Sequence, residues 1–161
     1  MDKKFELTTD TKMHFGRKLF RIKALISFGS VKAGDKGGYV ESEKNLSQSG
    51  DAWVYGDARV YGNAEVCGDA RVYGNAWVYN SAKIYGSAEV FNNAKVFGNA
   101  KVYNRAKVYG NSWIYGKAEI HDNARVYDAS DVYGNTSVCG KSRICGDTVI
   151  YDNALAGEQS D

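Results

Sequence analysis

The chain of 161 residues contains no proline, only three cysteines, two methionines and two histidines. Three cysteines without a framework spacing give no disulfide scaffold, so we expect a reduced, cytoplasmic location. The charges nearly cancel, with 21 basic and 19 acidic side chains, which argues against a nucleic-acid binder. No apolar run approaches the ~20 residues of a membrane-spanning helix. The start, Met1-Asp2-Lys3-Lys4-Phe5, lacks the apolar core of a signal peptide.

What the chain does contain is a six-residue repeat. From Val54 to Ile150, a column of 17 residues at six-residue steps holds only Val and Ile. Two residues before each lies Ala, Ser or Thr, and two residues after each lies Gly, Asn or Asp. No helix has this period, and a plain strand would alternate with period two. The 18 glycines and the hydrophobic fraction of 43% suit a repetitive β architecture and argue against disorder.

Each group of six residues predicts one short strand and one bend. The stretch Ala58-Arg59-Val60-Tyr61 alternates inward and outward side chains, as a strand requires. Gly62-Asn63 then follows, and a column limited to Gly, Asn and Asp indicates a left-handed backbone, which these residues tolerate. Because every bend has the same length and sense, successive strands cannot be antiparallel neighbours, and the chain must coil.

The unit Val-Tyr-Gly-Asn-Ala-x resembles the hexapeptide repeat of left-handed parallel β-helix proteins, in which three hexads form one coil of 18 residues. The resemblance covers residues 46–155. It implies an all-β fold, a left-handed parallel β-helix of five to six coils stacked about 4.8 Å apart. We therefore divide the chain into an N-terminal β cap at 1–45, the hexapeptide-repeat β-helix at 46–155 and a short tail at 156–161.

The first 50 residues predict a β-hairpin that caps the solenoid. One strand has a single buried face, formed by Phe20, Ile22, Ala24 and Ile26. Gly16-Arg17 turns back toward a first strand around Phe5–Leu7 or near Met13–Phe15. A cap is expected because a solenoid otherwise leaves unpaired strand edges at its ends.

This N-terminal segment, continued into Gly50-Asp51-Ala52-Trp53-Val54-Tyr55, resembles the opening of uncharacterised bacterial and phage hexapeptide-repeat proteins labelled as transferases. That resemblance implies a phage or prophage setting. The tail is too short to act as a second cap, so we expect the last coil to present an open edge. An open edge invites end-to-end pairing or another homo-oligomer.

Folding the repeat by 18 sorts the outward residues onto three faces. The first face carries an aromatic and cationic cluster that forms our candidate binding site: Trp77, Tyr79, Lys95, Phe97, Trp113 and Tyr115. Two tryptophans two coils apart on one face form a patch that calls for an explanation. The interpretations are a subunit interface, since the resembled family commonly forms trimers, a contact with a host protein or small ligand, or scattered surface aromatics.

The position directly after each Val or Ile holds 11 Tyr, 2 Phe, 3 Cys and His121. In enzymes of the resembled family this position is commonly small or acidic, so the aromatic column is a departure. Stacked aromatics at the corners would stiffen the ladder at ~0.2–1 kcal/mol for each cross-strand pair. They would also suit a contact surface, because Tyr and Trp dominate binding hot spots.

Catalysis is the less favoured interpretation. Acyltransferases of the resembled family typically use a histidine as general base in a cleft closed by projecting loops. His121 is the only histidine of the repeat, but an unbroken array of hexads offers no such loop, and His14 in the cap is a weaker candidate. Cys67 and Cys139 are four coils apart, roughly 19 Å. No residues have metal-ligand spacing, so we expect no metal and no cofactor.

The sequence thus favours a non-catalytic β-helical scaffold that forms a homo-oligomer, either a trimer or an end-to-end dimer. It would bind a host protein or a small ligand through its aromatic faces, with inhibition of a host defence as one setting. Neither nucleic acid nor membrane is an expected partner. The alternative is a hexapeptide-repeat acyltransferase that uses His121 as general base.

Overall fold

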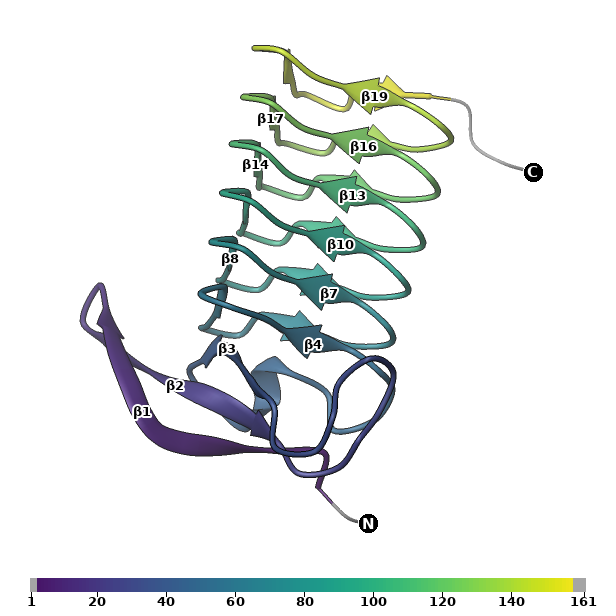
Figure 1. Ribbon diagram of the computed structural model, residues 1–161. Coiled ribbons are helices and arrows are strands. Elements are labelled where there is room, and N and C mark those ends of the chain that lie inside the picture. Colours follow the sequence, from purple (N-terminus) through teal and green to yellow (C-terminus); the bar gives the residue numbers. More distant parts are fainter. Residues whose placement is uncertain (1–2, 158–161) are drawn as a thin grey trace.

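The computed structural model describes residues 3–157 and shows a β-hairpin followed by a stack of parallel coils (Figure 1). Strands β1 (Phe5–His14) and β2 (Arg17–Ala24) form the hairpin, and β3 (Lys36–Val40) pairs with β2 in antiparallel orientation. A single turn of 3-10 helix, η1 (Glu43–Asn45), follows. Within residues 3–157, no helix is long and apolar enough to cross a membrane.

The remaining strands of the described chain, β4–β21, have two residues each and recur every six residues in three sheets. Sheet 1 continues from β1, β2 and β3 through β5 (Arg59–Val60), β8 (Trp77–Val78), β11 (Lys95–Val96), β14 (Trp113–Ile114), β17 (Asp131–Val132) and β20 (Val149–Ile150). Sheet 2 contains β4 (Trp53–Val54), β7 (Arg71–Val72), β10 (Glu89–Val90), β13 (Lys107–Val108), β16 (Arg125–Val126) and β19 (Arg143–Ile144). Sheet 3 contains β6 (Glu65–Val66), β9 (Lys83–Ile84), β12 (Lys101–Val102), β15 (Glu119–Ile120), β18 (Ser137–Val138) and β21 (Leu155–Ala156).

The predicted parallel β-helix is confirmed, as is the assignment of outward residues to three faces. Each strand pairs in parallel with the strand 18 residues away, as Val96 does with Ile114. The stack is longer than the five to six coils predicted and makes about seven turns. The reason is that β3 and Leu46 already pair in parallel with β5 and Val66, which adds a coil before β5.

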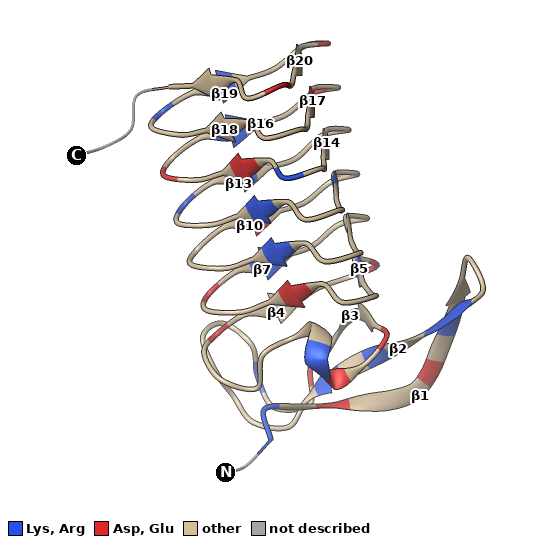
Figure 2. Ribbon diagram, turned by 180° about the vertical axis from the view of Figure 1, so that it is seen from behind, with Lys and Arg blue, Asp and Glu red and all other residues tan. Residues whose placement is uncertain are grey.

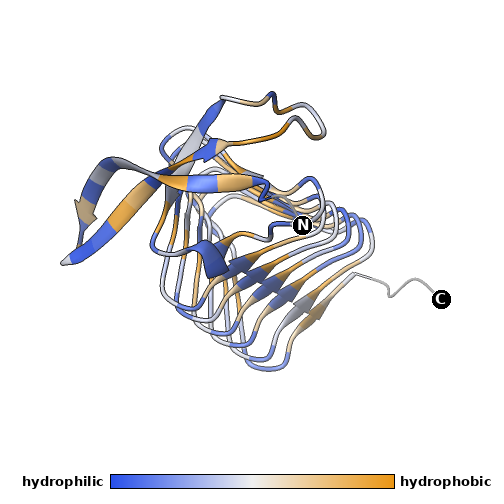
Figure 3. Ribbon diagram, turned by 90° about the horizontal axis from the view of Figure 1, so that it is seen from below, coloured by the Kyte–Doolittle hydropathy of each residue, from blue (hydrophilic) through white to orange (hydrophobic). Residues whose placement is uncertain are grey.

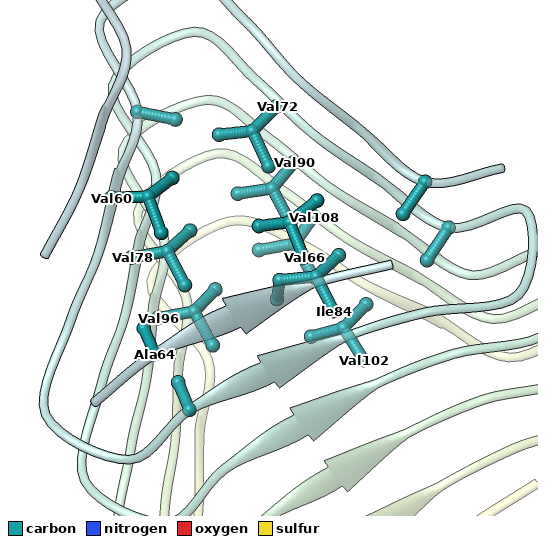
Figure 4. Packing of buried hydrophobic residues seen from close by; sticks show 14 of the residues in the cluster. Val60, Ala64, Val66, Val72, Val78, Ile84, Val90, Val96, Val102 and Val108 are labelled. Atoms are coloured by element: carbon teal, nitrogen blue, oxygen red, sulfur yellow. The ribbon is translucent and has the colours of Figure 1, made fainter. Parts of the chain in front are cut away.

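The Val and Ile column fills the interior. Every member from Val54 to Val138 is 0% exposed, and the adjoining Ala column is buried beside it. Figure 4 shows Val60, Val78 and Val96 stacked one above another. Each such side chain contributes ~1.5–3 kcal/mol through burial. In the last coil, Ile144 and Ile150 are only partly buried, because no described coil covers them.

The bends adopt the predicted left-handed backbone. All the Gly, Asn and Asp residues that follow the aliphatic column by two positions have positive φ, from 56° at Asp152 to 71° at Gly134. At these angles a β-branched side chain would clash with its own backbone, which explains the restricted composition of the column.

Side chains of the cap satisfy carbonyl groups of the first coils. The Lys4 ammonium donates to the carbonyl oxygens of Gly50 at 3.3 Å and Ala52 at 2.8 Å. The Asn45 amide donates to the carbonyl oxygens of Gly62 at 3.1 Å and Ala64 at 2.9 Å. These oxygens lie at the end of the hydrogen-bond ladder, where an unpaired buried group would cost about 1–3 kcal/mol. The cap therefore completes the polar as well as the apolar packing.

The hairpin crosses the end of the three-sided stack, as the view from below shows (Figure 3). Its predicted buried face is confirmed at Ile22 and Ala24, and Phe20 is half-buried. The prediction was wrong for Ile26, which is 41% exposed because β2 already ends at Ala24. Leu19 is buried on the opposite face of the hairpin.

The last described coil exposes Val149, Tyr151 and Leu155, whose exposed fractions are 50%, 49% and 60%. The predicted tail begins inside β21, and its residues 158–161 lie outside the described residues.

Candidate functional site

A groove of about 390 Å³ runs along the outer surface of sheet 1. Four consecutive coils line it, each with the outward residue of its strand and the bend residue two positions earlier. The lining residues are Asp57, Arg59, Asn75, Trp77, Asn93, Lys95, Asn111 and Trp113. Amide and carboxylate groups thus form one wall, and aromatic and cationic groups form the other.

Lys95 lies between the two tryptophans of the groove. Its Nζ atom is 4.2 Å from the centre of the Trp77 ring and 5.1 Å from that of Trp113. A cation over an aromatic face contributes about 0.5–2 kcal/mol, depending on desolvation. Trp113 is 43% exposed, a large area for an indole side chain. One tryptophan of the groove therefore presents its ring to solvent.

The tip of the hairpin covers the other tryptophan. The ring of His14 meets Trp77 edge-on with 4.4 Å between ring centres, and Phe15 does so at 5.7 Å. Phe15 itself is 80% exposed and has a positive φ of 48°. The tip thus closes the groove at its N-terminal end, which sequence reasoning did not predict. Over 60 residues separate the partners, and nothing in a repeat pattern reports on a contact with a segment outside it.

His14 is buried between charged and aromatic groups, with 4% of its surface exposed. Its Nδ1 accepts a hydrogen bond from the Arg59 guanidinium, which can only donate. Its Nε2 therefore carries the proton in the neutral ring and donates to the Tyr61 hydroxyl at 3.1 Å. Burial, followed by the charges of Arg59, Lys12 and Lys95, lowers the pKa of His14 to about 4. Burial also raises the pKa of Tyr61, so this cluster holds a neutral histidine and a neutral phenol.

The structure separates the six predicted binding residues into two columns on the same face. Trp77, Lys95 and Trp113 line the groove. Tyr79, Phe97 and Tyr115 belong instead to an aromatic ladder at the adjoining corner, in which consecutive rings are stacked 4.8–4.9 Å apart. The ladder spacing matches the separation of the strands, so these rings support one another along the stack.

His121 lies on sheet 3, away from this groove. Its Nδ1 is 3.4 Å from Oδ1 of Asp122, and its Nε2 is 3.0 Å from Oγ of Ser137. The imidazole is stacked on Tyr103, with 4.9 Å between ring centres and 3° between planes. Sequence reasoning singled out His121 but neither of its polar partners, because Ser137 lies in the next coil.

The Asp122 carboxylate is fixed by three groups. The Gly140 amide donates to Oδ2 at 3.0 Å, and the Asn104 side chain donates to Oδ1 at 3.2 Å. The Gly140 hydrogen bond, with smaller contributions from His121 and Asn104, lowers the pKa of Asp122. This carboxylate therefore stays ionised next to His121.

A second groove, of about 500 Å³, borders Asp122 along the corner between sheets 3 and 2. Successive bends form its walls, and it is lined by Gly86, Ser87, Asn104, Arg105, Asp122, Asn123, Gly140 and Lys141.

Charged side chains of both signs occur along the whole stack (Figure 2). Glu89 on sheet 2 pairs with Lys107 of the following coil at 3.4 Å between Nζ and Oε2. Such half-exposed pairs contribute only about 0–1 kcal/mol. Cys67, Cys139 and Cys145 are free thiols.

A family model described as the YdcK beta solenoid repeat matches residues 52–68, 64–80 and 70–86. The three matches begin at multiples of six residues from one another, in step with the strands of the structure. A comparison with curated proteins gave no match. The family match and the structure agree on a β-solenoid. The resemblance to hexapeptide-repeat transferases and the phage setting stay predictions.

Proposed function

We propose that this chain is a non-catalytic β-solenoid scaffold that binds its partner or ligand in the groove of sheet 1. The observation that carries the proposal is the exposed Trp113 at the end of the Trp77, Lys95 and Trp113 stack, facing a wall of asparagines. Tryptophan and arginine are the residues most enriched at binding hot spots.

The groove is suited to a ligand that has a flat apolar face and a polar edge. Trp113 offers the stacking surface, and Asn93 and Asn111 offer donors and acceptors beside it. Because the groove residues are held on consecutive strands of one sheet, binding orders few additional side chains. A homo-oligomer and a host partner, the expectations from sequence, fit the same surface.

The test combines solution mass with ligand capture. Trp77→Ser and Trp113→Ser variants are compared with the native chain and with Arg125→Ser, which changes the equivalent outward position on sheet 2. We expect the tryptophan variants to lose either self-association, measured by light scattering, or fluorescence-detected binding of oligosaccharides and nucleotides. The Arg125 variant should keep both. Tryptophan variants that retain the native mass and the native binding would overturn the proposal.

The alternative, an acyltransferase with His121 as general base, is favoured by one observation, the Asp122 carboxylate beside Nδ1. A carboxylate in this position orients an imidazole and raises its basicity. Turnover of acetyl-CoA with hydroxyl or amine acceptors that disappears in His121→Ala would replace the scaffold proposal with this one.

A further inference from the structure

We propose that Ser137, His121 and Asp122 form a nucleophilic triad in which Ser137 is acylated by small esters. The site lies on sheet 3 and does not rest on the binding function proposed for sheet 1.

The three residues depart from the repeat at one place in space. Ser137 is the only serine in the column of outward strand residues from Trp53 to Val149. His121 is the only histidine in the corner column, and Asp122 stands in a bend column where glycine prevails. Departures from a repeat that served no common purpose would be scattered along a solenoid. These meet within hydrogen-bond reach of one ring.

The charge on Asp122 sets the roles of the two imidazole nitrogens. The ionised carboxylate is 3.4 Å from Nδ1 and favours a proton there. In the neutral ring Nε2 is then a hydrogen-bond acceptor, so the Ser137 hydroxyl donates to it across 3.0 Å. A hydroxyl that donates to an imidazole oriented by a carboxylate is the arrangement that activates serine nucleophiles.

The arrangement is held rigidly before any substrate arrives. Stacking on Tyr103 fixes the plane of the His121 ring, and the Gly140 amide and the Asn104 side chain fix the Asp122 carboxylate. The His121 side chain keeps 13% of its surface exposed. The groove that borders Asp122 leaves space beside the ring for the remainder of a substrate.

The reaction balances without a further reagent. Oγ of Ser137 attacks the ester carbonyl carbon as its proton moves to Nε2 of His121. The ester C–O bond then breaks, and the departing alkoxide takes this proton and leaves as an alcohol. Water attacks the acyl-serine by the same proton path, which releases the carboxylic acid and restores Ser137. Asp122 stabilises the transient imidazolium.

The experiment uses a fluorophosphonate probe and p-nitrophenyl acetate with the full chain. We expect one fluorophosphonate adduct, located on Ser137 by peptide mass spectrometry, and release of p-nitrophenol above the buffer rate. Ser137→Ala and His121→Ala should each abolish the adduct and lower the release at least tenfold, because general-base activation contributes about 10²–10⁴. Asp122→Asn should slow adduct formation with the fold retained, since it disfavours the required tautomer.

Ser81→Ala is the matched control, because Ser81 is an exposed serine of a bend and should leave labelling unchanged. Circular dichroism and the thermal midpoint establish that each variant is folded. A native chain that forms no adduct on Ser137, or a folded Ser137→Ala chain that releases p-nitrophenol at the native rate, would overturn the triad. Trp113→Ser should leave labelling unaltered, so failure of the groove and failure of the triad are told apart.

Discussion

The ammonium of Lys95 lies over the ring of Trp77 at 4.2 Å, while its other side faces Trp113 at 5.1 Å. The three residues are consecutive along sheet 1, since Lys95 pairs with Trp77 on one side and with Trp113 on the other. A cation placed between two indoles attracts both, so the stack holds the groove wall in one conformation. This arrangement gives the groove residues a measurable contribution to stability.

Replacing Lys95 with Met removes the cation and keeps most of the apolar stem. We expect the free energy of unfolding to fall by about 1 kcal/mol, the size of a partly exposed cation–π contact. Trp fluorescence should change as well, because the charge beside both indoles is lost. Lys101→Met is the matched control, since Lys101 occupies the equivalent position on sheet 3 between Lys83 and Glu119. Equal losses in the two variants, measured by urea denaturation, would contradict the stack.

The bends predict a contrast between two glycines with nearly the same backbone. Gly110 has a φ of 69° and Gly146 a φ of 71°. A Cβ at Gly110 would lie 2.7 Å from the Asp128 amide nitrogen, whereas one at Gly146 would meet nothing within 4 Å. Gly146→Ala should therefore cost only the left-handed strain of about 1–2 kcal/mol. Gly110→Ala should cost clearly more, because a backbone must also move, and thermal midpoints of both variants measure the difference.

The aliphatic column predicts a gradient toward the end of the described stack. Ile114 is 0% exposed, and Ile150 is only partly buried. Ile114→Ala should lower the free energy of unfolding by about 2–5 kcal/mol, the range for a buried cavity. Ile150→Ala should cost markedly less, because its surroundings already admit solvent. Denaturation curves that rank the two variants in the opposite order would argue against the stacking of coils described here.

The sequence predicted the β-helix because the fold is built from local rules repeated many times. An aliphatic residue, a small residue and a left-handed bend each have one physical solution, so residues such as Val96 and Asn92 report their environment directly. The number of coils was predicted less well. Gly38 and Leu46 contribute to the first coil through pairing with β5 and Val66, and no hexad rule reads that segment.

The candidate sites were predicted only where they follow the period. The stack of Trp77, Lys95 and Trp113 appears once the sequence is folded by 18, since the three residues share a column. The cover of His14 and Phe15 over Trp77 depends on how the hairpin bends around the end of the stack. The contact of His121 with Ser137 depends on side-chain rotamers that bridge two coils, which a one-dimensional pattern does not contain.

The buried His14 predicts a dependence of stability on pH. Its pKa is about 4 in the folded chain, against 6.5 for an ordinary histidine, mainly because burial opposes the charged form. Between these values the unfolded chain binds more protons than the folded chain, so stability rises with pH. His14 therefore contributes its full stability above pH 6.5, and this contribution is lost as the pH falls toward 4. At pH 4.5 the loss should be on the order of 2 kcal/mol.

The His14→Gln variant isolates this contribution from the carboxylates that titrate in the same acidic range. Glutamine has an amide oxygen to accept from Arg59 and an amide nitrogen to donate to Tyr61, yet it carries no titratable proton. Urea denaturation of both chains at pH 4.5 and pH 7, followed by Trp fluorescence, gives the comparison. We expect the native chain to lose more stability than the variant when the pH is lowered. Parallel losses in the two chains would show that His14 titrates alike in the folded and unfolded states, and that the hairpin tip does not exclude water from it.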